Sequence, residues 1–231
     1  AVCYGLTVSE GVIVKELARC ADYLGPEFQR IKREVKELAA VNVDETSWRV
    51  GGQTKWLWDF IKEKHSLLVI RDTRGKHVLN EVLGEWYGGV VTSDCLHTYD
   101  KLSCEQQKCW AHLLRDARKL TGKEGEVLLG SLKHLNRLAK TGDLSRDDME
   151  HMLDEAISKE FTSLWCINLV NRIKRFRHEW FTFMDHPDVE DTNNAAERGL
   201  RPSVVMRKIT GGNRSQKGAR NHEIIMSVKQ T

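Results

Sequence analysis

The stretch Val41-Asn42-Val43-Asp44-Glu45-Thr46 is a short β-branched run that carries a carboxylate within an apolar alternation. Such a run is typical of a β-strand, in which Val41 and Val43 point to one face and Asp44 points to the other. A carboxylate on a rigid strand is unfavourable unless something cationic meets it. Asp44 is therefore the first candidate site residue, and the rest of the chain is expected to bring a cation to it.

The segments that follow predict an α/β fold built on a mixed sheet of five strands. β-Branched and aromatic runs between turn signals mark the strands, and apolar residues at helical spacing mark a helix over 75–84. Because this helix precedes the fourth strand, that strand returns by a crossover and can lie beside the first. Asp94, which ends the fourth strand, is then expected next to Asp44. The strands are predicted at 41–46 with 48–50, at 55–61 after a Gly51-Gly52 turn, and at 66–71, 90–94 and 107–111.

Helical patterns flank and interrupt this sheet. An apolar stripe runs through an N-terminal helical segment, residues 1–40, in which Gly25-Pro26 predicts either one kinked helix or two short ones. Three amphipathic stripes between 120 and 185 predict an all-helical insertion, because nothing there alternates with period two. The insertion divides the sheet-bearing core into residues 41–119 and 186–231. The second part holds a capped helix with a glutamate and a basic C-terminal region.

The composition is that of a soluble globular protein with an uneven distribution of charge. The chain has 231 residues, of which 40% are hydrophobic and 30% are charged, and its formal net charge is +3. That charge is too small to indicate a polyanionic partner by itself, and a run of charges usually forms a solvated face. Two basic clusters that flank the carboxylates favour a phosphate backbone as ligand. The first has seven basic and no acidic residues from Arg198 to Arg220, and the second consists of Arg172, Lys174, Arg175 and Arg177.

Cysteine usage and hydropathy indicate the cellular compartment in which the chain is expected. Six cysteines are scattered without the spacing of a disulfide framework, so we expect reduced thiols and a cytoplasmic location. Cys104, Cys109 and His112 lack a second ligand pair at zinc-finger spacing, which favours core cysteines. No run approaches the roughly 18 apolar residues of a membrane span, and no signal peptide is evident. We therefore expect no membrane partner.

Four local motifs follow one another along the chain: Val43-Asp44-Glu45-Thr46, Ser93-Asp94 with Tyr99, Cys109-Trp110-Ala111-His112 with Arg115, and Asn193-Asn194-Ala195-Ala196-Glu197-Arg198-Gly199-Leu200-Arg201-Pro202 followed by Arg207-Lys208. In this order they resemble the catalytic region of DDE transposases of the insertion-sequence-66 type. The resemblance runs from about Leu6 to Arg220. Carboxylate spacing alone is a weak signal, because 33 acidic residues supply many triads by chance. The local contexts make the resemblance specific.

The resemblance implies a ribonuclease-H-like fold and a DDE-type transposase that cleaves DNA strands and transfers them during transposition. Asp44, Asp94 and Glu197 would be the catalytic residues and the metal ligands. Asp44 would be shared by two Mg²⁺ or Mn²⁺ ions, and each of the other two would complete one ion. Hard oxygen ligands suit these ions, which together can activate an attacking oxygen and stabilise a leaving one. The implied partners are transposon ends, target DNA and further copies of the chain assembled on DNA.

Basic residues around the glutamate are the candidates for contact with DNA. Arg201 shares a helix face with Glu197, so it either clamps a phosphate or forms an intrahelical ion pair. His112 either supports the metal site by orienting a bound water or touching DNA, or is a hydrogen-bonded core histidine. Glu45 points to the strand face opposite Asp44 and is excluded from the metal site. The DNA-contact candidates are Arg198, Arg201, Arg207, Lys208, Arg214 and Lys217.

Two alternatives stay open on these residues. The first alternative to a transposase is a related metal-dependent nuclease that does not transfer strands, and the second is a decayed fragment that binds DNA through its basic clusters without catalysis. The intact triad argues against decay. Longer members of the family carry upstream DNA-binding segments, one of them cysteine-rich, and this chain begins after them, at Ala1. We therefore expect sequence-specific recognition of transposon ends to depend on more than these residues.

Overall fold

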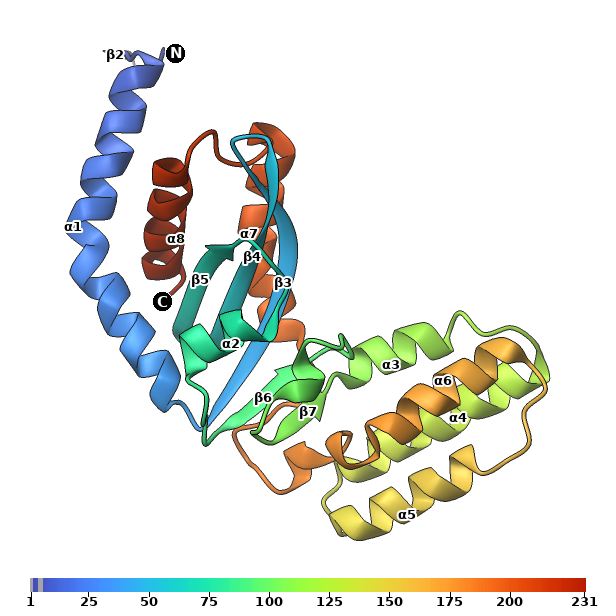
Figure 1. Ribbon diagram of the computed structural model, residues 1–231. Coiled ribbons are helices and arrows are strands. Elements are labelled where there is room, and N and C mark those ends of the chain that lie inside the picture. Colours follow the sequence, from blue (N-terminus) through green and yellow to red (C-terminus); the bar gives the residue numbers. More distant parts are fainter. Residues whose placement is uncertain (1, 4–5) are drawn as a thin grey trace. The chain divides into compact units, whose positions relative to one another are not determined.

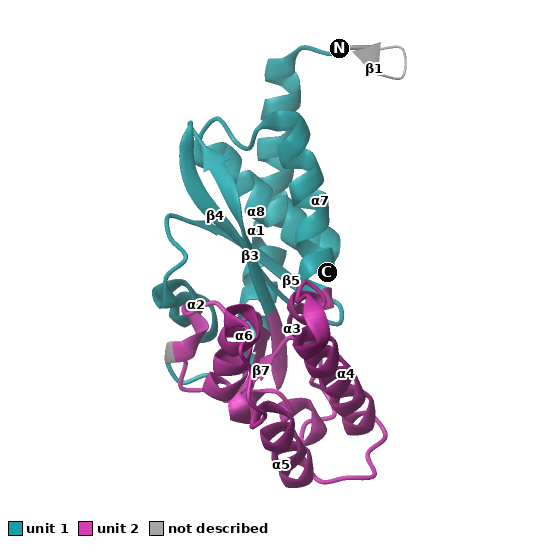
Figure 2. Ribbon diagram, turned by 90° about the vertical axis from the view of Figure 1, so that its right-hand side faces the viewer, with its two compact units in different colours: residues 1–38, 43–87, 195–231 teal, residues 39–42, 88–194 magenta. Residues whose placement is uncertain are grey.

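The computed structural model (Figure 1) describes residues 2–3 and 6–231. These residues form two compact units, which are coloured separately in Figure 2. Unit 1 comprises residues 1–38, 43–87 and 195–231, and unit 2 comprises residues 39–42 and 88–194. Each unit is therefore assembled from segments that are far apart in the sequence.

A mixed sheet of five strands organises the chain. The strands are β3 (Ala40–Val50), β4 (Gln53–Lys62), β5 (His65–Arg71), β6 (Val90–Ser93) and β7 (Gln106–Lys108), and a separate small sheet pairs β1 (Val2–Cys3) with β2 (Leu6–Thr7). The order in the large sheet is β5-β4-β3-β6-β7. β4 and β5 are antiparallel, whereas β6 runs parallel to both β3 and β7. The predicted mixed sheet, with its fourth strand beside its first, is confirmed.

Unit 1 carries a long N-terminal helix, α1 (Glu10–Glu37), which bends along its length in Figure 1. Ser9 caps its start, because the Ser9 Oγ accepts a hydrogen bond of 3.3 Å from the N–H of Val12. Pro26 lies inside this single helix, so the alternative of two short helices is wrong. Buried residues begin only at Ala21, which means that the second half of α1 holds it to the unit.

The last helix of unit 1, α8 (Gln216–Gln230), covers the outer edge of β5 (Figure 1). Side chains four residues apart accept hydrogen bonds from alternate N–H groups of this edge strand. Four residues of a helix span about 6 Å along its axis, and two residues of a strand span about 6.6 Å. The spacing of the acceptor side chains on α8 therefore matches the spacing of the N–H groups on β5. The bonds run from Ser66 N to Thr231 Oγ1 (3.1 Å), from Leu68 N to Ser227 Oγ (2.8 Å) and from Ile70 N to Glu223 Oε1 (2.6 Å). The helix thereby satisfies an edge that would otherwise invite pairing with another chain.

Two further helices of unit 1 are α2 (Lys76–Leu83) and α7 (Asn194–Thr210). α7 packs against the sheet through an apolar cluster that also includes α8. Buried apolar area contributes about 25 cal/mol per Å², so this cluster is a main source of stability for the unit. Its buried members are Trp48, Val50, Leu57, Leu68, Ile70, Leu200, Ala219 and Met226.

Unit 2 joins the short strands β6 and β7 to a group of helices. These are η1 (Tyr99–Lys101), α3 (Trp110–Ala117), α4 (Gly122–Ala139), α5 (Arg146–Ile157), α6 (Leu164–Arg175), η2 (Arg177–Glu179) and η3 (Thr182–Met184). Residues 120–185 are all described and hold no strand, so the helical character expected there is confirmed. None of the helices within the described ranges is long and apolar enough to cross a lipid bilayer.

The fifth strand is shorter than the sequence predicts. The strand expected at 107–111 is wrong over its second half, because β7 ends at Lys108 and α3 begins at Trp110. The Trp110 indole is fully buried in the helical core, where its Nε1 donates a hydrogen bond of 2.5 Å to the carbonyl of Trp180. Packing into that core decides the conformation here, and it overrides the local strand pattern.

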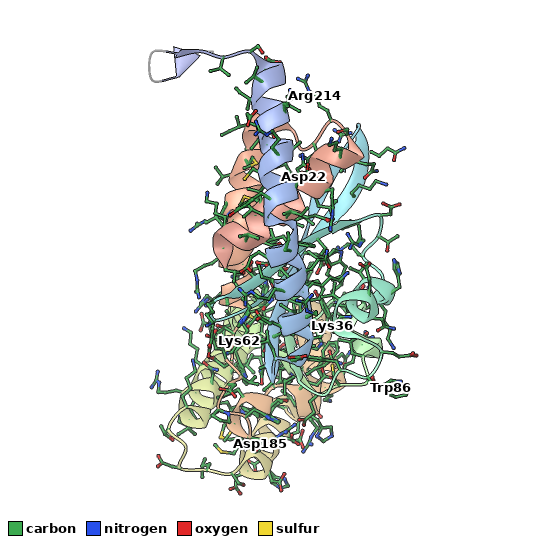
Figure 3. The ribbon with its side chains drawn as sticks, turned by 90° about the vertical axis from the view of Figure 1, so that its left-hand side faces the viewer. Asp22, Lys36, Lys62, Trp86, Asp185 and Arg214 are labelled. Carbon is green, nitrogen blue, oxygen red and sulfur yellow. The ribbon has the colours of Figure 1, made fainter. Side chains whose placement is uncertain are left out.

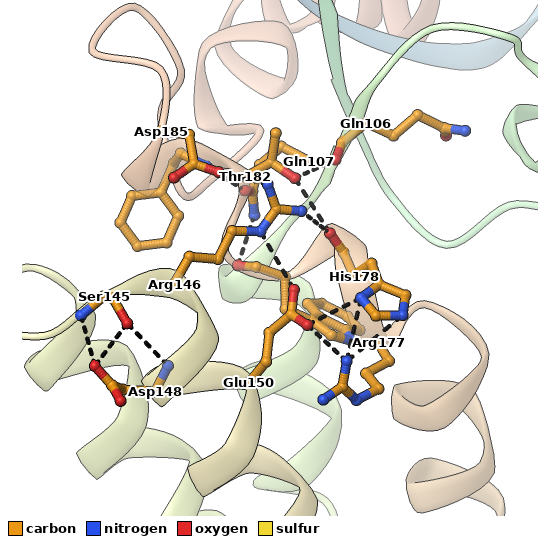
Figure 4. A network of polar contacts seen from close by, with 12 residues as sticks. Gln106, Gln107, Ser145, Arg146, Asp148, Glu150, Arg177, His178, Thr182 and Asp185 are labelled. Atoms are coloured by element: carbon orange, nitrogen blue, oxygen red, sulfur yellow. Dashed lines mark hydrogen bonds and ion pairs between the residues drawn. The ribbon is translucent and has the colours of Figure 1, made fainter.

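A polar network ties α5 to the segment that follows α6 (Figure 4). Its centre is the buried carboxylate of Glu150. Arg146 contributes a second ion pair, to Asp185 at 2.6 Å. The buried charge is thus matched by cations, as burial of an ionised group requires. The partners of Glu150 are Arg146 at 3.2 Å, Arg177 at 2.6 Å and His178 at 2.9 Å.

Candidate active site

Asp44 stands on the face of β3 that α7 covers. Side chains alternate along a strand, so Asp44, Trp48 and Val50 share one face. Trp48 and Val50 belong to the same buried cluster as Leu200 of α7. The Asp44 side chain is only partly buried, and its Oδ1 accepts a hydrogen bond of 2.9 Å from the N–H of Glu45. Asp44 is thus held on a rigid strand while its carboxylate stays accessible to water.

Glu197 lies in the first turn of α7, three residues before Leu200. Residues three apart are neighbours on one helix face, so Glu197 lies on the side of α7 that packs against the sheet. Glu197 is partly buried, as Asp44 is. Both residues belong to unit 1. The two carboxylates therefore lie on the same side of the sheet.

The close approach of α7 to the sheet depends on a glycine. Gly199 is buried against β4, where an added Cβ would lie 1.9 Å from Oδ2 of Asp59 and 3.3 Å from Cδ1 of Ile61. Any larger residue would push the helix outward, and glycine alone leaves room for it at this distance. Gly199 follows Glu197 by two residues. It therefore sets how closely the glutamate can approach the sheet.

Asp59 is a residue of this region that the sequence patterns did not single out. It is fully buried on β4, and its Oδ1 accepts a hydrogen bond of 3.0 Å from Ser66 Oγ. Its Oδ2 is buried without a hydrogen-bond partner in the described part of the chain. Burial raises the pKa of Asp59 to about 8; the bond from Ser66 opposes this rise, and the charge of Asp44 adds to it. The available signal was a carboxylate set between two aromatic residues, Trp58 and Phe60, within a buried strand.

Arg207 is engaged with the strand that carries Asp44. Its Nη1 donates hydrogen bonds of 3.1 Å to Thr46 Oγ1 and to Ser47 Oγ, and a further bond to the Ser47 carbonyl. These contacts hold the C-terminal half of α7 on β3. The guanidinium is thereby committed to the fold, and its predicted contact with DNA stays a prediction.

A buried histidine connects α7, α8 and β3. The Nε2 of His222 lies 3.0 Å from Ser203 Oγ, and its ring centroid lies 4.7 Å from that of Trp48. Burial lowers the pKa of His222 to about 4, so the imidazole is neutral at pH 7. The contact reinforces the side of the sheet on which Asp44 and Glu197 lie.

Asp94 belongs to unit 2 and directly follows β6. Its Oδ1 accepts a hydrogen bond of 2.9 Å from the N–H of Leu96, which fixes the turn after the strand. β6 runs parallel to β3, and the register pairs Thr92 with Asn42. Asp94 therefore follows this pair by two residues, as Asp44 does along β3.

The segment that leads into α7 is fastened to the start of β3 within unit 2. Asn193 is fully buried, and its Oδ1 accepts a hydrogen bond of 3.2 Å from Nδ2 of Asn42. The same Nδ2 donates to the carbonyl of Thr192 at 3.2 Å, and the N–H of Asn193 donates to Cys109 Sγ at 3.1 Å. This asparagine of the fourth motif therefore holds the chain just ahead of Glu197.

The three predicted metal ligands have suitable chemistry and are divided between the units. Asp44, Asp94 and Glu197 offer carboxylate oxygens, the hard donors that Mg²⁺ and Mn²⁺ prefer, and all three are partly exposed. Among the described residues, no three His, Cys, Asp or Glu side chains form a group that could hold one metal ion. Asp94 lies in unit 2 and the other two lie in unit 1. A shared metal site stays a prediction.

Two other residues considered from the sequence have separate surroundings. Glu45 is buried, and its Oε1 accepts a hydrogen bond of 2.9 Å from Nε of Arg74, whose guanidinium stacks over the Trp56 ring at 4.4 Å. Glu45 is therefore a structural ion pair, which agrees with its exclusion from the metal site. His112 lies partly buried in the first turn of α3. Its supporting role also stays a prediction.

The remaining DNA-contact candidates are exposed. Arg198, Arg201 and Lys208 lie on α7. Lys217 lies in the first turn of α8, and Arg214, labelled in Figure 3, lies in the loop just before that helix. Exposed cations are free to exchange water for phosphate oxygens at little cost. These five residues therefore differ from Arg207 in being available to a polyanion.

The glycine-rich loop between α7 and α8 is seated on the β3–β4 hairpin. Asn213 donates from its N–H to the carbonyl of Arg49 at 2.8 Å, and its Oδ1 accepts a bond of 2.7 Å from the indole of Trp48. Gly212 has a φ of +109°, and a Cβ there would lie 2.3 Å from the Arg49 carbonyl oxygen, so the site requires glycine. An open cavity of about 370 Å³ between loop and hairpin is lined by Arg49, Arg214 and glycines of both turns.

The chain is similar to known proteins. The sequence model of the family described as "Transposase IS66 family" matches residues 2–221. The uncharacterized protein y4hP of Sinorhizobium fredii is 22% identical over 283 residues of alignment, which cover 99% of this chain and 51% of that protein. This chain therefore spans about half the length of that relative. The family match extends over nearly all of both units.

Proposed function

Because the chain belongs to the IS66 transposase family, we propose that it is the catalytic region of a DDE-type transposase, which cleaves and transfers DNA strands with divalent metal ions. The proposal includes a ribonuclease-H-like core. The strand order β5-β4-β3-β6-β7, in which an antiparallel set is continued by parallel strands, supports that assignment. The four motifs with their carboxylates all lie within the matched residues.

One observation supports the proposal most directly: Asp44 and Glu197 lie on the same side of the sheet in unit 1. Leu200 packs with Trp48 in one buried cluster, and Gly199 brings α7 close to β4. A strand and a helix thereby present one carboxylate each to a common side. Rigid elements position ligands more accurately than loops do, which a metal site requires.

Asp94 is proposed as the third ligand. It follows Thr92, which pairs with Asn42 on β3, and Asp44 follows Asn42 by the same number of residues. In parallel strands, equal steps from a paired couple lead to the same edge of the sheet. The register of β3 and β6 therefore supports a metal site to which Asp44 and Asp94 both contribute.

The residues of the chain have distinct tasks in the proposed reaction. When bound, two Mg²⁺ or Mn²⁺ ions would activate the attacking oxygen and stabilise the leaving one. Asp44, Asp94 and Glu197 would hold them. Arg198 and Arg201, exposed beside Glu197, would bind phosphates of the transposon end or target DNA. Further copies of the chain would assemble on that DNA.

A supercoiled plasmid assay tests the proposal. The purified chain is incubated with plasmid and Mg²⁺, with and without a labelled duplex that carries the terminal sequences of the element encoding it. Nicking is followed on gels, and joining of the label to plasmid reports strand transfer. Asp44→Asn, Asp94→Asn and Glu197→Gln should each lower the rate by at least about a hundredfold, because charge stabilisation supplies most of the acceleration.

The matched control is Glu190→Gln, which alters an exposed carboxylate on the approach to α7 and should leave the rate unchanged. A thermal melt gives an independent readout. Mg²⁺ should raise the melting temperature of the parent and leave that of Asp44→Asn unchanged, because only the parent binds the ion. Nicking without joining in the presence of end DNA would identify a nuclease instead. Equal rates for Asp44→Asn and the parent would overturn the proposal.

A further inference from the structure

Unit 2 contains a cavity that the proposed chemistry does not use. It lies between the end of α3, the start of α4 and α6, and its volume is about 660 Å³. That is within the ordinary range for sites that take small molecules, about 300–1,000 Å³. Its apolar walls are Leu120, Trp165 and Leu169, and its polar groups include Thr121 and Asn168.

Trp165 is the unusual residue of this cavity. Its side chain is 76% exposed, and the neighbouring Leu164 is 67% exposed. The same unit buries Trp110 and Trp180 completely, so it has a core that accommodates indoles. Exposed apolar groups beside a cavity mark binding surfaces. The indole of Trp165 is therefore placed to meet a ligand.

The start of α6 is fixed before any ligand arrives. The carboxylate of Glu124 on α4 accepts hydrogen bonds from the N–H groups of Thr162 (3.1 Å) and Ser163 (3.0 Å) and from the Thr162 hydroxyl (2.6 Å). A carboxylate at a helix N-terminus is also favoured by the helix dipole. Trp165 follows two residues after Ser163, so the backbone that carries its indole is fixed in advance. Preorganisation of this kind lowers the cost of binding.

The charges around the cavity indicate the class of ligand. Residues 115–124 hold four basic residues and two acidic residues, Asp116 and Glu124. Asp116 already pairs with Lys119 at 2.7 Å and with Arg172 at 2.8 Å. Two other basic residues of this stretch, Arg118 and Lys123, are exposed to solvent. The surroundings are therefore net positive and suit a ligand that combines an aromatic surface with phosphate.

We propose that this cavity takes an unpaired nucleobase of DNA, which stacks on Trp165 while the neighbouring cations bind the adjoining phosphates. The inference rests on the proposed function, because that function supplies DNA as the substrate. Stacking on an aromatic side chain suits any base, since every base has a π face. Asn168 and Thr121 offer donors and acceptors to the edge of the base. The cavity would thus hold one base from an unpaired part of the strand.

Binding measurements by fluorescence anisotropy test the site. Two labelled DNAs of equal length are used in EDTA, one fully paired and one with an unpaired three-nucleotide overhang. Trp165→Ala should weaken binding of the overhang DNA by about 5- to 100-fold, which corresponds to the loss of one base stack. Binding of the paired DNA should change less than about twofold. Trp165→Phe, which keeps an aromatic face, should restore most of the affinity.

Trp86→Ala is the matched control. Trp86 is 82% exposed in unit 1 and extends away from the ribbon in Figure 3, and it does not line the cavity beside Trp165. This variant should bind both DNAs as the parent does. An equal loss on both DNAs with Trp165→Ala, or no loss on either, would overturn the nucleobase site.

Sedimentation separates a nucleic-acid site from a protein interface. If Trp165→Ala converts an oligomer of the free chain to a monomer, the cavity is a contact between copies and the proposal is wrong. The binding assay contains no divalent metal, so it is independent of cleavage. A parent chain that fails to nick plasmid but shows the Trp165 effect would refute only the proposed function.

Discussion

Gly199 of α7 lies so close to Asp59 of β4 that a Cβ at residue 199 would stand 1.9 Å from the Asp59 Oδ2. Asp59 is fully buried and its Oδ1 accepts a hydrogen bond from Ser66, so the surrounding side chains oppose any movement of its carboxyl group. Gly199→Ala should therefore force α7 off the sheet and lower the free energy of unfolding by about 1–3 kcal/mol. Urea denaturation of the variant and the parent measures the difference.

A double-mutant cycle identifies the clash as the cause. In an Asp59→Ala background the space opens, and Gly199→Ala should then cost less than about 1 kcal/mol. Gly130→Ala is the control, because Gly130 lies inside α4 with nothing within 4 Å of an added Cβ. It should stabilise the chain by about 0.5–1 kcal/mol. Equal costs of Gly199→Ala in both backgrounds would contradict the steric explanation.

The buried His222 makes stability depend on pH. Its pKa in the folded chain is about 4, below the ordinary value of 6.5, so the unfolded chain binds the proton more tightly. The stability that His222 contributes is therefore complete above pH 6.5 and is lost as the pH falls through the window from 6.5 to 4. Between pH 7 and pH 5 the parent should lose about 2 kcal/mol through this group.

Between pH 7 and pH 5, His222→Gln should lose about 2 kcal/mol less stability than the parent, because glutamine does not titrate and can still bond to Ser203. Asp59, whose raised pKa makes stability fall as the pH rises from 5 to 7, acts equally in both chains. The measurement is urea denaturation at pH 7, 6 and 5 for each chain. His134→Gln removes an exposed histidine of α4 and should keep the slope of the parent. An unchanged slope in His222→Gln would show that the imidazole is not held neutral by burial.

Removal of one hydroxyl group, that of Ser227, should show how much the contact between α8 and the edge of β5 contributes to stability. Ser227→Ala removes the acceptor of the 2.8 Å bond from Leu68 N and leaves that buried N–H without a partner. The expected loss is about 1–3 kcal/mol. Amide hydrogen exchange should show lower protection at Leu68 itself. Lys229→Ala, an exposed change on the same helix, should alter stability by no more than about 0.5 kcal/mol.

Much of the sheet could be predicted because β-branched runs and glycine turns are local signals. The run around Val41 and the hairpin after Val50 needed no tertiary information, and the crossover before Val90 followed from the helix between the strands. The prediction of the fifth strand failed over its second half because Trp110 packs into a helical core, which forms from residues far apart in the sequence. Local propensity cannot show which of two cores an aromatic residue will join.

α8 was missed for a different physical reason. Its polar residues Glu223 and Ser227 are buried against a strand edge, so the helix lacks a clean apolar stripe. Asp59 and Arg207 illustrate the same limit at the candidate site. Charge patterns predicted a contact of Arg207 with DNA, which stays a prediction, but they could not predict its hydrogen bonds to Ser47, because these depend on how α7 packs on β3. Such pairings are nonlocal and leave no spacing rule in the sequence.

The structure separates two kinds of arginine in the basic region, and the salt dependence of DNA binding should do the same. Arg214 and Lys217 are exposed, whereas Arg207 is bound to β3. If the exposed pair neutralises two phosphates, Arg214→Ala with Lys217→Ala should lower affinity for duplexes of any sequence. It should also flatten the plot of log K against log salt by about 1.8, since each contact contributes roughly 0.9.

Arg207→Ala should behave differently, because it removes bonds to Thr46 and Ser47 that hold α7 on the sheet. We expect it to lower the free energy of unfolding by about 1–3 kcal/mol. If the guanidinium makes no further contact with phosphate, the salt slope should stay near that of the parent, whereas a slope lower by about 0.9 would show the DNA contact predicted from the sequence. Lys133→Ala with Lys159→Ala removes two exposed lysines outside the basic region and serves as the charge-matched control. Anisotropy titrations at four salt concentrations give the slopes. If the Arg214 and Lys217 variant has the slope of this control, the exposed cations at the start of α8 do not contact phosphate, and DNA must bind elsewhere on the chain.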